Sequence, residues 1–283
     1  MGFRKVISSF GRILAGQRAM IGDLDRPVPP REQVGTLQFR NLVWETDHRL
    51  RVGDACFELS TSSYTARTTD EVIVLLKTRG MVEWYRKLLE GSNTRNILEF
   101  GTWEGGSPLF FGTATSVAKF VGIDLRGESA AIDRQIAKNG VSNRVRIFHR
   151  TSQSDRAAVS KIIDQQFSEP LDVVIDDASH QYVHTKAAFE IAFPRLRVGG
   201  LYIIEDWNWA HYENFRCQEE WRQDPALSNL VLELTLALGS HCRSIGLIEI
   251  GPWYVVVRKM AETPANFRLD DVIRLGTRSF VKI

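Results

Sequence analysis

The stretch "NILEFGTWEGGS", residues 96–107, decides the fold. Apolar residues surround Glu99 as they would in a buried strand, and the glycines that follow indicate a turn leading into a helix. Glycine allows backbone conformations and close approaches that other residues do not. The stretch therefore predicts a strand, a tight turn and a helix, with a ligand lying across the turn.

Further strands alternate with helix-length segments downstream of this unit. The candidates are "KFVGID" (119–124), "RVRIFH" (144–149), "LDVVIDD" (171–177) and "LYIIED" (201–206). This alternation predicts a parallel sheet with helices on both faces. The stretch "IGLIEIGPWYVVVRK" (245–259) indicates two antiparallel strands joined by a short turn. We therefore expect an α/β, Rossmann-like sheet that is mostly parallel, with one antiparallel strand near the C-terminus.

The sequence changes character near residue 67. Residues 1–66 are irregular, and we expect them to form an N-terminal cap or oligomerisation segment before a domain at 67–283. Thr68 and Glu71 have the spacing of a capping box, which predicts a helical segment from there to Gly91. Apolar residues at helical spacing within residues 3–14 indicate an amphipathic helix. It would pack on the domain, on a second subunit, or against a membrane surface.

Composition excludes several classes of protein. The 283 residues carry a net charge of only +2, which gives no reason to expect a nucleic-acid binder, since such proteins usually have a basic face. The three cysteines form no CxxC pair, so neither a disulfide framework nor a zinc site is expected. No apolar run reaches the length of a membrane span, and no signal peptide pattern is present. We expect a cytoplasmic protein, and the apolar surface of residues 1–66 favours a homo-oligomer.

Residues 99–106 read ExGxxxGG, which resembles motif I of class I S-adenosylmethionine-dependent methyltransferases more than the GxGxxG of NAD enzymes. The resemblance implies that S-adenosylmethionine binds across the turn, at Glu99, Gly101, Thr102 and Gly105. Asp124 ends the next strand, 19 residues after Gly105. A carboxylate there can accept hydrogen bonds from ribose hydroxyls, in this cofactor as in NAD.

Two further segments are expected to contact the cofactor. The loop "TSQSD" (151–155) follows the third strand, where the family places its contacts to adenine, and this assigns Gln153, Ser154 and Asp155. Side chains alternate along an extended strand, so Asp176 should point away from Asp177. Asp176 would then face the amino group of the cofactor.

Acidic residues end two consecutive strands, in "IDDASH" (175–180) and "IIEDW" (203–207). Ligands of open α/β sheets bind outside the carboxyl ends of the strands, so Asp177, Glu205 and Asp206 should converge there. Three carboxylates without a nearby cysteine favour a hard divalent cation, with magnesium first. The alternative is that these acids cap the helices that follow.

His180 lies three residues beyond Asp177 and could act as a general base. Alternatively, it could be hydrogen-bonded within the crevice wall, or form an HxxxH metal pair with His184. We expect His184 to be structural, because the neighbouring ligands are oxygen atoms. Trp207, Trp209 and Tyr212 follow the acidic pair and could stack on a sugar ring or simply pack in the interior.

The pattern "IDDASHxxxHxxxxFxxxFPRLRVGGLYIIED" (175–206) is similar to that of magnesium-dependent sugar O-methyltransferases. The resemblance, which covers roughly residues 95–258, implies transfer of a methyl group to a sugar hydroxyl, with a small molecule or an oligosaccharide as the substrate. It makes Asp177, Glu205 and Asp206 the magnesium ligands and His180 the base. Three other functions stay open: methylation of a catechol-like phenol, a non-catalytic cofactor-binding subunit, and a nucleotide-sugar dehydrogenase or epimerase.

Overall fold

The computed structural model describes residues 36–60, 65–216, 225–240 and 242–283. The chain divides into two compact units, Met1–Glu32 and Gln33–Ile283. The first unit, with the amphipathic pattern at 3–14, lies outside the described residues. None of the described helices is long and apolar enough to cross a membrane.

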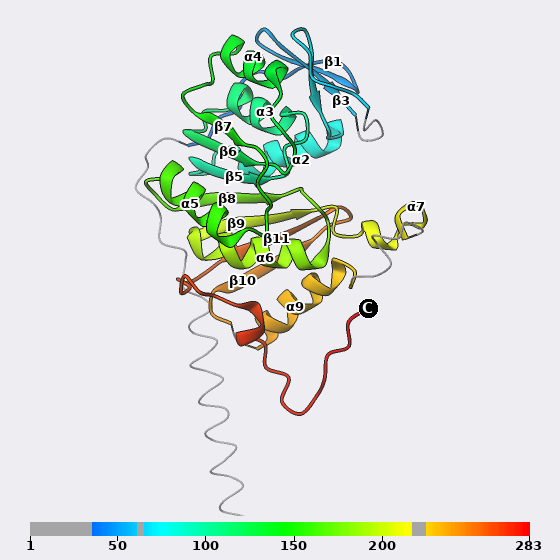
Figure 1. Cartoon of the computed structure of the whole chain (residues 1–283), viewed down its shortest axis with the longest axis vertical. Coiled ribbons are helices and arrows are strands. Elements are labelled where there is room, and N and C mark those ends of the chain that lie inside the picture. Colours follow the sequence, from blue (N-terminus) through cyan, green and yellow to red (C-terminus); the bar gives the residue numbers. More distant parts are fainter. Residues whose placement is uncertain (1–35, 61–64, 217–224, 241) are drawn as a thin grey trace, which may run out of the picture. The chain divides into compact units, whose positions relative to one another are not determined.

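A seven-stranded sheet forms the centre of the second unit, in the order β10-β11-β9-β8-β5-β6-β7 (Figure 1). Strands β9, β8, β5, β6 and β7 are mutually parallel, whereas β11 is antiparallel to both of its neighbours. The fold class expected from the sequence is therefore confirmed. The strands are β5 (Asn96–Phe100), β6 (Lys119–Ile123), β7 (Val145–Phe148), β8 (Leu171–Asp176), β9 (Leu196–Glu205), β10 (Ile245–Ile250) and β11 (Tyr254–Lys259).

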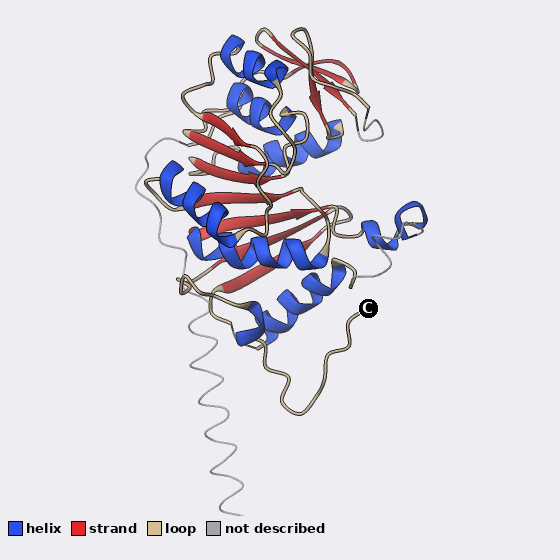
Figure 2. Cartoon of the chain, in the orientation of Figure 1, coloured by secondary structure: helices blue, strands red, loops and turns tan. Residues whose placement is uncertain are grey.

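Helices cover both faces of this sheet (Figure 2). Side chains alternate along β5, so Leu98 and Phe100 pack with α5, α6 and α9, whereas Ile97 packs with α2, α3 and α4. The α-helices are α2 (Arg79–Leu89), α3 (Gly106–Ala114), α4 (Ala130–Lys138), α5 (Arg156–Gln166), α6 (Tyr182–Ala192), α7 (Glu213–Arg216) and α9 (Ser228–Gly239). Three short 3₁₀ turns are η1 (Phe193–Arg195), η2 (Trp209–His211) and η3 (Leu269–Asp271).

A second, four-stranded sheet precedes the first one in the chain. Its order is β1 (Val43–Thr46), β2 (Arg49–Val52), β3 (Ala55–Leu59) and β4 (Ile73–Leu75). The pairs β1–β2 and β2–β3 are antiparallel, and β3–β4 is parallel. This small sheet takes strands from both sides of the boundary expected at residues 66 and 67.

The prediction that a helix begins at Thr68 is wrong. Residues 73–75 form β4 instead, and the helix α2 begins only after Thr78, whose Oγ1 accepts a hydrogen bond from the Met81 amide at 3.2 Å. Thr68 Oγ1 donates to the carbonyl of Glu104 rather than capping a helix. The β-branched Ile73 and Val74 pair with β3, and this tertiary partner overrides the local pattern.

Helix α3 lies between the two sheets and is buried on all sides. All nine of its residues are buried, and it contacts β3 and β4 of the small sheet as well as β6 and β7. A helix that is apolar all round belongs in such an interior position. Its first residue, Gly106, lies so close to β4 that a Cβ atom would be 2.3 Å from the Val74 carbonyl oxygen.

We therefore expect Gly106→Ala to lower the free energy of unfolding by about 2–3 kcal/mol, because β4 must move to admit a methyl group. Gly239→Ala is the matched control, since a Cβ atom there meets nothing within 4 Å. That control should leave stability unchanged or raise it slightly. Urea unfolding of both variants is the measurement, and equal stabilities would contradict this account of the contact.

Candidate functional site

The loops after the parallel strands are unusual in their backbone conformation. Four described residues other than glycine have a positive φ: Trp103, Arg150, His180 and Asp206. They follow β5, β7, β8 and β9, respectively, so all lie in loops at the carboxyl edge of the sheet. A positive φ costs about 1–3 kcal/mol for such residues, and such strain clusters at functional sites. Two of the four, His180 and Asp206, belong to the site expected from the sequence.

A buried lysine joins two of the three expected metal ligands. Lys77 Nζ lies 3.0 Å from Asp177 Oδ2 and 2.7 Å from Glu205 Oε1. Tyr85 OH donates a second hydrogen bond, at 2.6 Å, to Glu205 Oε1. Lys77 is 3% exposed and Glu205 is fully buried, so water does not screen this ion pair. The structure thus brings the acids of β8 and β9 together around one internal cation.

Lys77 and Tyr85 were missed by sequence reasoning. Lys77 lies between β4 and α2, inside the segment expected to be one helix, and Tyr85 is on α2. An isolated lysine or tyrosine on a predicted helix carries no sequence signal for a site 100 or more residues away. The true end of β4 would have placed Lys77 in a loop, but only the pairing with β3 defines that end.

Burial is the main cause that raises the pKa of each of the three acids. Burial, followed by repulsion from Asp177 and Glu205, raises the pKa of Asp206 to about 8. Burial also raises the pKa of Asp177 and of Glu205, and Lys77 opposes both shifts. For Lys77, burial would lower the pKa, but the two carboxylates outweigh it and the pKa is raised. The site has more negative charge than one lysine balances, so it favours a further cation.

His180 stands beside this acidic cluster. Its Nε2 lies 3.8 Å from Asp177 Oδ1, and its ring centroid lies 4.2 Å from that of Trp209. Burial lowers the pKa of His180 to about 4, although the backbone and carboxylate of Glu205 oppose the shift. The imidazole is therefore neutral at pH 7, and its contact with Asp177 is not an ion pair. A neutral imidazole can accept a proton or bind a metal.

Among the described residues, Asp177, His180 and Asp206 form a group that could hold a metal ion, since each offers one ligand atom within 4.8 Å of the others. Glu205 is not in this group, and its Oε1 accepts hydrogen bonds from Lys77 and Tyr85. Its other oxygen, Oε2, is buried and has no hydrogen-bond partner. When all three carboxylates are ionised, they carry three negative charges against the one positive charge of Lys77, so one divalent cation would balance the site. The donor set thus fits a hard divalent ion.

The glycine turn is held by Asp124 and packs closely against the next loop. Asp124 Oδ2 accepts hydrogen bonds from the amides of Thr102 (2.7 Å) and Trp103 (2.8 Å). Gly101 has φ +82°, and a Cβ atom there would lie 2.1 Å from the carbonyl oxygen of Asp177. Gly105 has φ +74°, and a Cβ atom there would lie 2.8 Å from the side chain of Ile132. Gly101 thus lets the turn approach the acidic loop, and Gly105 lets it approach α4.

Glu99, at the start of the motif, is fully buried, and neither of its carboxylate oxygens has a hydrogen-bond partner. Burial raises the pKa of Glu99 well above its usual range, although Lys77 opposes this shift. A buried acceptor without a donor is costly. The side chain is therefore suited to a ligand that brings a donor group.

The loop at 151–155, which the sequence predicts to contact adenine, forms hydrogen bonds within the protein itself. Gln153 Nε2 donates to Asp176 Oδ1 at 3.0 Å, and Tyr202 OH donates to Asp176 Oδ2 at 2.9 Å. Both oxygens of Asp176 thus have partners, and burial raises its pKa to about 7. Asp155 Oδ1 accepts from the Ala157 and Ala158 amides and caps α5. For Asp155 the structure therefore provides a helix-capping role.

His184 and the aromatic residues also have protein partners. His184 Nδ1 lies 3.1 Å from Ser154 Oγ and is not among the ligand group. Trp207 Nε1 donates to the carbonyl of Gly251 at 3.0 Å. Trp209 stacks on Phe215 with ring centroids 4.4 Å apart and also contacts His180. Only Trp209, among the three aromatic residues considered, has a ring contact with the expected base.

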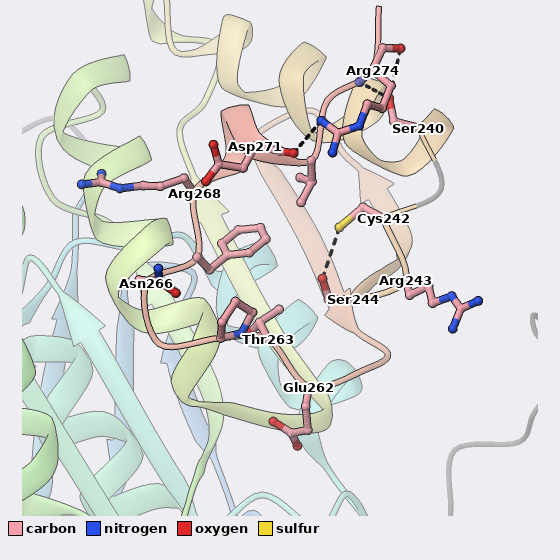
Figure 3. Close-up of a pocket in the computed structure, with 13 residues that line it drawn as sticks. Ser240, Cys242, Arg243, Ser244, Glu262, Thr263, Asn266, Arg268, Asp271 and Arg274 are labelled. Atoms are coloured by element: carbon pink, nitrogen blue, oxygen red, sulfur yellow. Dashed lines mark hydrogen bonds between the residues drawn. The ribbon is translucent and has the colours of Figure 1, made fainter.

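A cavity of about 420 Å³ lies elsewhere, among residues such as Ser244, Glu262 and Arg274 (Figure 3). Ser244 precedes β10, and Ile245 pairs with Lys259 at the end of β11. The other end of β11 pairs Tyr254 with Glu205. The cavity is therefore at the opposite edge of the sheet from the acidic cluster.

Residues 98–207 match the model of a family described as a methyltransferase domain. The matched segment includes the glycine turn, His180 and all three acids. Lys77 and Tyr85 lie upstream of the matched residues.

Two curated relatives are O-methyltransferases. The chain is 42% identical over 64 residues to the 8-demethyl-8-alpha-L-rhamnosyl tetracenomycin-C 2'-O-methyltransferase of Streptomyces olivaceus. This alignment covers 23% of this chain and 16% of the relative. It is 31% identical over 133 residues to the mycinamicin VI 2''-O-methyltransferase of Micromonospora griseorubida, covering 44% of this chain and 30% of the relative. The matches thus span less than a third of these relatives.

Solved structures share the fold. A protein assigned as a caffeoyl-CoA O-methyltransferase, from Staphylococcus aureus, aligns with a TM-score of 0.50 and 21% identity, over 65% of this chain and 85% of its own. The MycE methyltransferase of the mycinamycin biosynthetic pathway, in complex with Mg, SAH and mycinamycin VI, aligns with a TM-score of 0.47 and 23% identity. This alignment covers 59% of this chain and 45% of MycE. The first of these confirms the methyltransferase fold.

Lys77→Met should destabilise the protein by about 3–5 kcal/mol, because it leaves two buried carboxylates without their cation. Arg79→Met removes the same charge two residues away, from an exposed pair with Asp47, and should cost less than about 1 kcal/mol. Chemical denaturation of both variants measures the difference. A Lys77→Met variant as stable as Arg79→Met would show that the acids do not depend on Lys77.

Proposed function

We propose that this protein is a metal-assisted O-methyltransferase that transfers the methyl group of S-adenosylmethionine to a hydroxyl of a sugar or glycoside. The observation that carries the proposal is the meeting of three carboxylates and a neutral histidine at the carboxyl edge of a methyltransferase sheet. The names of the two curated relatives support O-methylation, and the rhamnosyl acceptor of one supports a sugar.

The glycine turn and its neighbours would hold the cofactor. Gly101, Thr102 and Gly105 form the turn, and Glu99 has two buried oxygens that the cofactor's amino group could satisfy. Asp124 Oδ1 accepts one hydrogen bond, from the amide of Arg126, and retains capacity for a ribose hydroxyl. Gln153 and Ser154 are proposed beside the adenine, whereas Asp155 and Asp176 already have protein partners.

The acids and His180 would carry the chemistry. Bound S-adenosylmethionine supplies a methyl group on a positively charged sulfur, and a bound divalent cation lowers the pKa of the acceptor hydroxyl. Asp177, Glu205 and Asp206 would hold that cation. His180 Nε2, which is neutral at pH 7, would accept the proton of the acceptor hydroxyl when that oxygen takes the methyl group and S-adenosylhomocysteine leaves.

Two parts of the proposal concern the whole protein. Residues 1–66 are proposed as a cap or oligomerisation segment and residues 67–283 as the methyltransferase domain. A homo-oligomer acting in the cytoplasm remains our prediction, and light scattering of the purified chain tests the oligomeric part.

Calorimetric titration tests cofactor choice first, with S-adenosylhomocysteine and NAD in parallel. Binding of the first without the second supports the proposal, and the reverse preference would contradict it. An acceptor panel then compares glycosides with catechols, using labelled S-adenosylmethionine and Mg²⁺. Labelling of catechols alone would point to a phenol O-methyltransferase.

His180→Ala should lower kcat at least about 100-fold, because the acceptor proton loses its base. Affinity for S-adenosylhomocysteine should not change. His211→Ala is the control, since the His211 ring pairs with Ser228 Oγ at 2.9 Å and not with an acid of the site among the described residues, so the variant should keep wild-type turnover. Full activity of His180→Ala would remove His180 as the base.

Chelation should abolish turnover. Treatment with EDTA removes the cation that the three acids are proposed to hold, so methyl transfer should stop and return when Mg²⁺ is added in excess. Binding of S-adenosylhomocysteine should survive the treatment, because the cofactor turn uses other residues. Turnover that is indifferent to EDTA would disprove the metal assistance.

A further inference from the structure

The two carboxylates that contact Lys77 are used unequally. Glu205 Oε1 accepts hydrogen bonds from Lys77 at 2.7 Å and from Tyr85 at 2.6 Å, whereas Glu205 Oε2 is buried without a partner. Asp177 Oδ2 accepts from Lys77 at 3.0 Å, and its Oδ1 lies on the side of His180, 3.8 Å from Nε2. In each carboxylate, one oxygen is bound to Lys77 and the other is not.

The donors are themselves fixed by packing. Tyr85 is 1% exposed, and its ring makes edge contacts with Trp84 (4.9 Å) and Phe111 (5.6 Å). The amide of Lys77 donates to the carbonyl of Leu75 at 2.8 Å, which ties the lysine to the end of β4. Because these donors cannot easily move, they fix the rotation of both carboxyl groups.

We infer that Lys77 and Tyr85 are positioning residues of the cation site, which hold one oxygen each of Asp177 and Glu205 and leave the other oxygen for the ion. This inference rests on the proposed function. It names two residues outside the matched domain, and it assigns the segment between β4 and α2 a part in cation binding. Groups that orient metal ligands commonly change metal affinity by about 10–100-fold when removed.

The charge of the site agrees with this role. With all three acids ionised, two negative charges remain after Lys77 is counted, so they would attract a second cation beside Lys77. Lys77 and one divalent ion can therefore bind together. The buried Glu205 Oε2 gains a partner only when an ion or another donor is present, which gives binding a specific site to satisfy.

Binding of Mn²⁺, followed by electron paramagnetic resonance of the free ion, tests the inference on the full chain without an assay of turnover. Tyr85→Phe removes one hydroxyl and no charge. We expect the Kd for Mn²⁺ to rise about 10-fold. Tyr254→Phe is the matched control: Tyr254 pairs with Glu205 through its backbone, but its hydroxyl donates to Glu249 at 2.8 Å rather than to one of the three acids, so its Kd should equal that of the wild type.

Lys77→Met provides a second test wherever it folds. Loss of positioning should weaken Mn²⁺ binding as well, whereas tighter binding would show that Lys77 competes with the ion and would overturn its assigned role. Tyr85→Phe with wild-type affinity for Mn²⁺ would overturn the role of Tyr85.

Titration of every variant with S-adenosylhomocysteine separates this inference from the proposed function. We expect unchanged affinity in Tyr85→Phe. A wild-type protein that binds S-adenosylhomocysteine but no Mn²⁺ would overturn the inference and leave the methyltransferase assignment standing. A wild-type protein that binds Mn²⁺ but no S-adenosylhomocysteine would instead contradict the proposed function.

Discussion

The ion pair between Lys77 and the acids Asp177 and Glu205 is the interaction on which the candidate site depends. Burying two carboxylates at the ends of neighbouring strands costs several kcal/mol for each charge unless a cation compensates. Lys77 provides that compensation from a segment about 100 residues upstream in the chain. The acidic edge is thus compatible with a folded protein even before any ion binds.

Much of the fold follows from local patterns. Buried β-strands such as 96–100 and 171–176 are recognisable because their apolar runs are bounded by turn residues, and the hairpin at 245–259 follows from its two apolar runs around Gly251 and Pro252. The segment 68–78 could not be predicted, because Ile73 and Val74 form a strand only through pairing with β3. The local propensity of a segment carries no information about a strand partner that is distant in sequence.

The candidate site shows the same division. Asp177, Glu205, Asp206 and His180 could be placed together because parallel strands end at one edge, and the structure does bring them together. Lys77 and Tyr85 determine which oxygen of Asp177 and of Glu205 is left without a bond to them. No rule of sequence spacing relates Lys77 and Tyr85 to these acids. Asp155 and Asp176 show the converse: their side chains suit a ligand, yet a helix end and the pair Gln153 and Tyr202 already use them.

The position of Lys77 directly after β4 couples the small sheet to the acidic edge. Any opening of β4 that carries Lys77 away would leave two buried charges uncompensated, so local unfolding of this sheet and disruption of the site should be one cooperative event. By linkage, a ligand that binds only the assembled site must slow hydrogen exchange of the amides in β4 and α2. Hydrogen exchange in the small sheet, which contributes no residue to the matched domain, would thereby show whether a ligand is bound at the site.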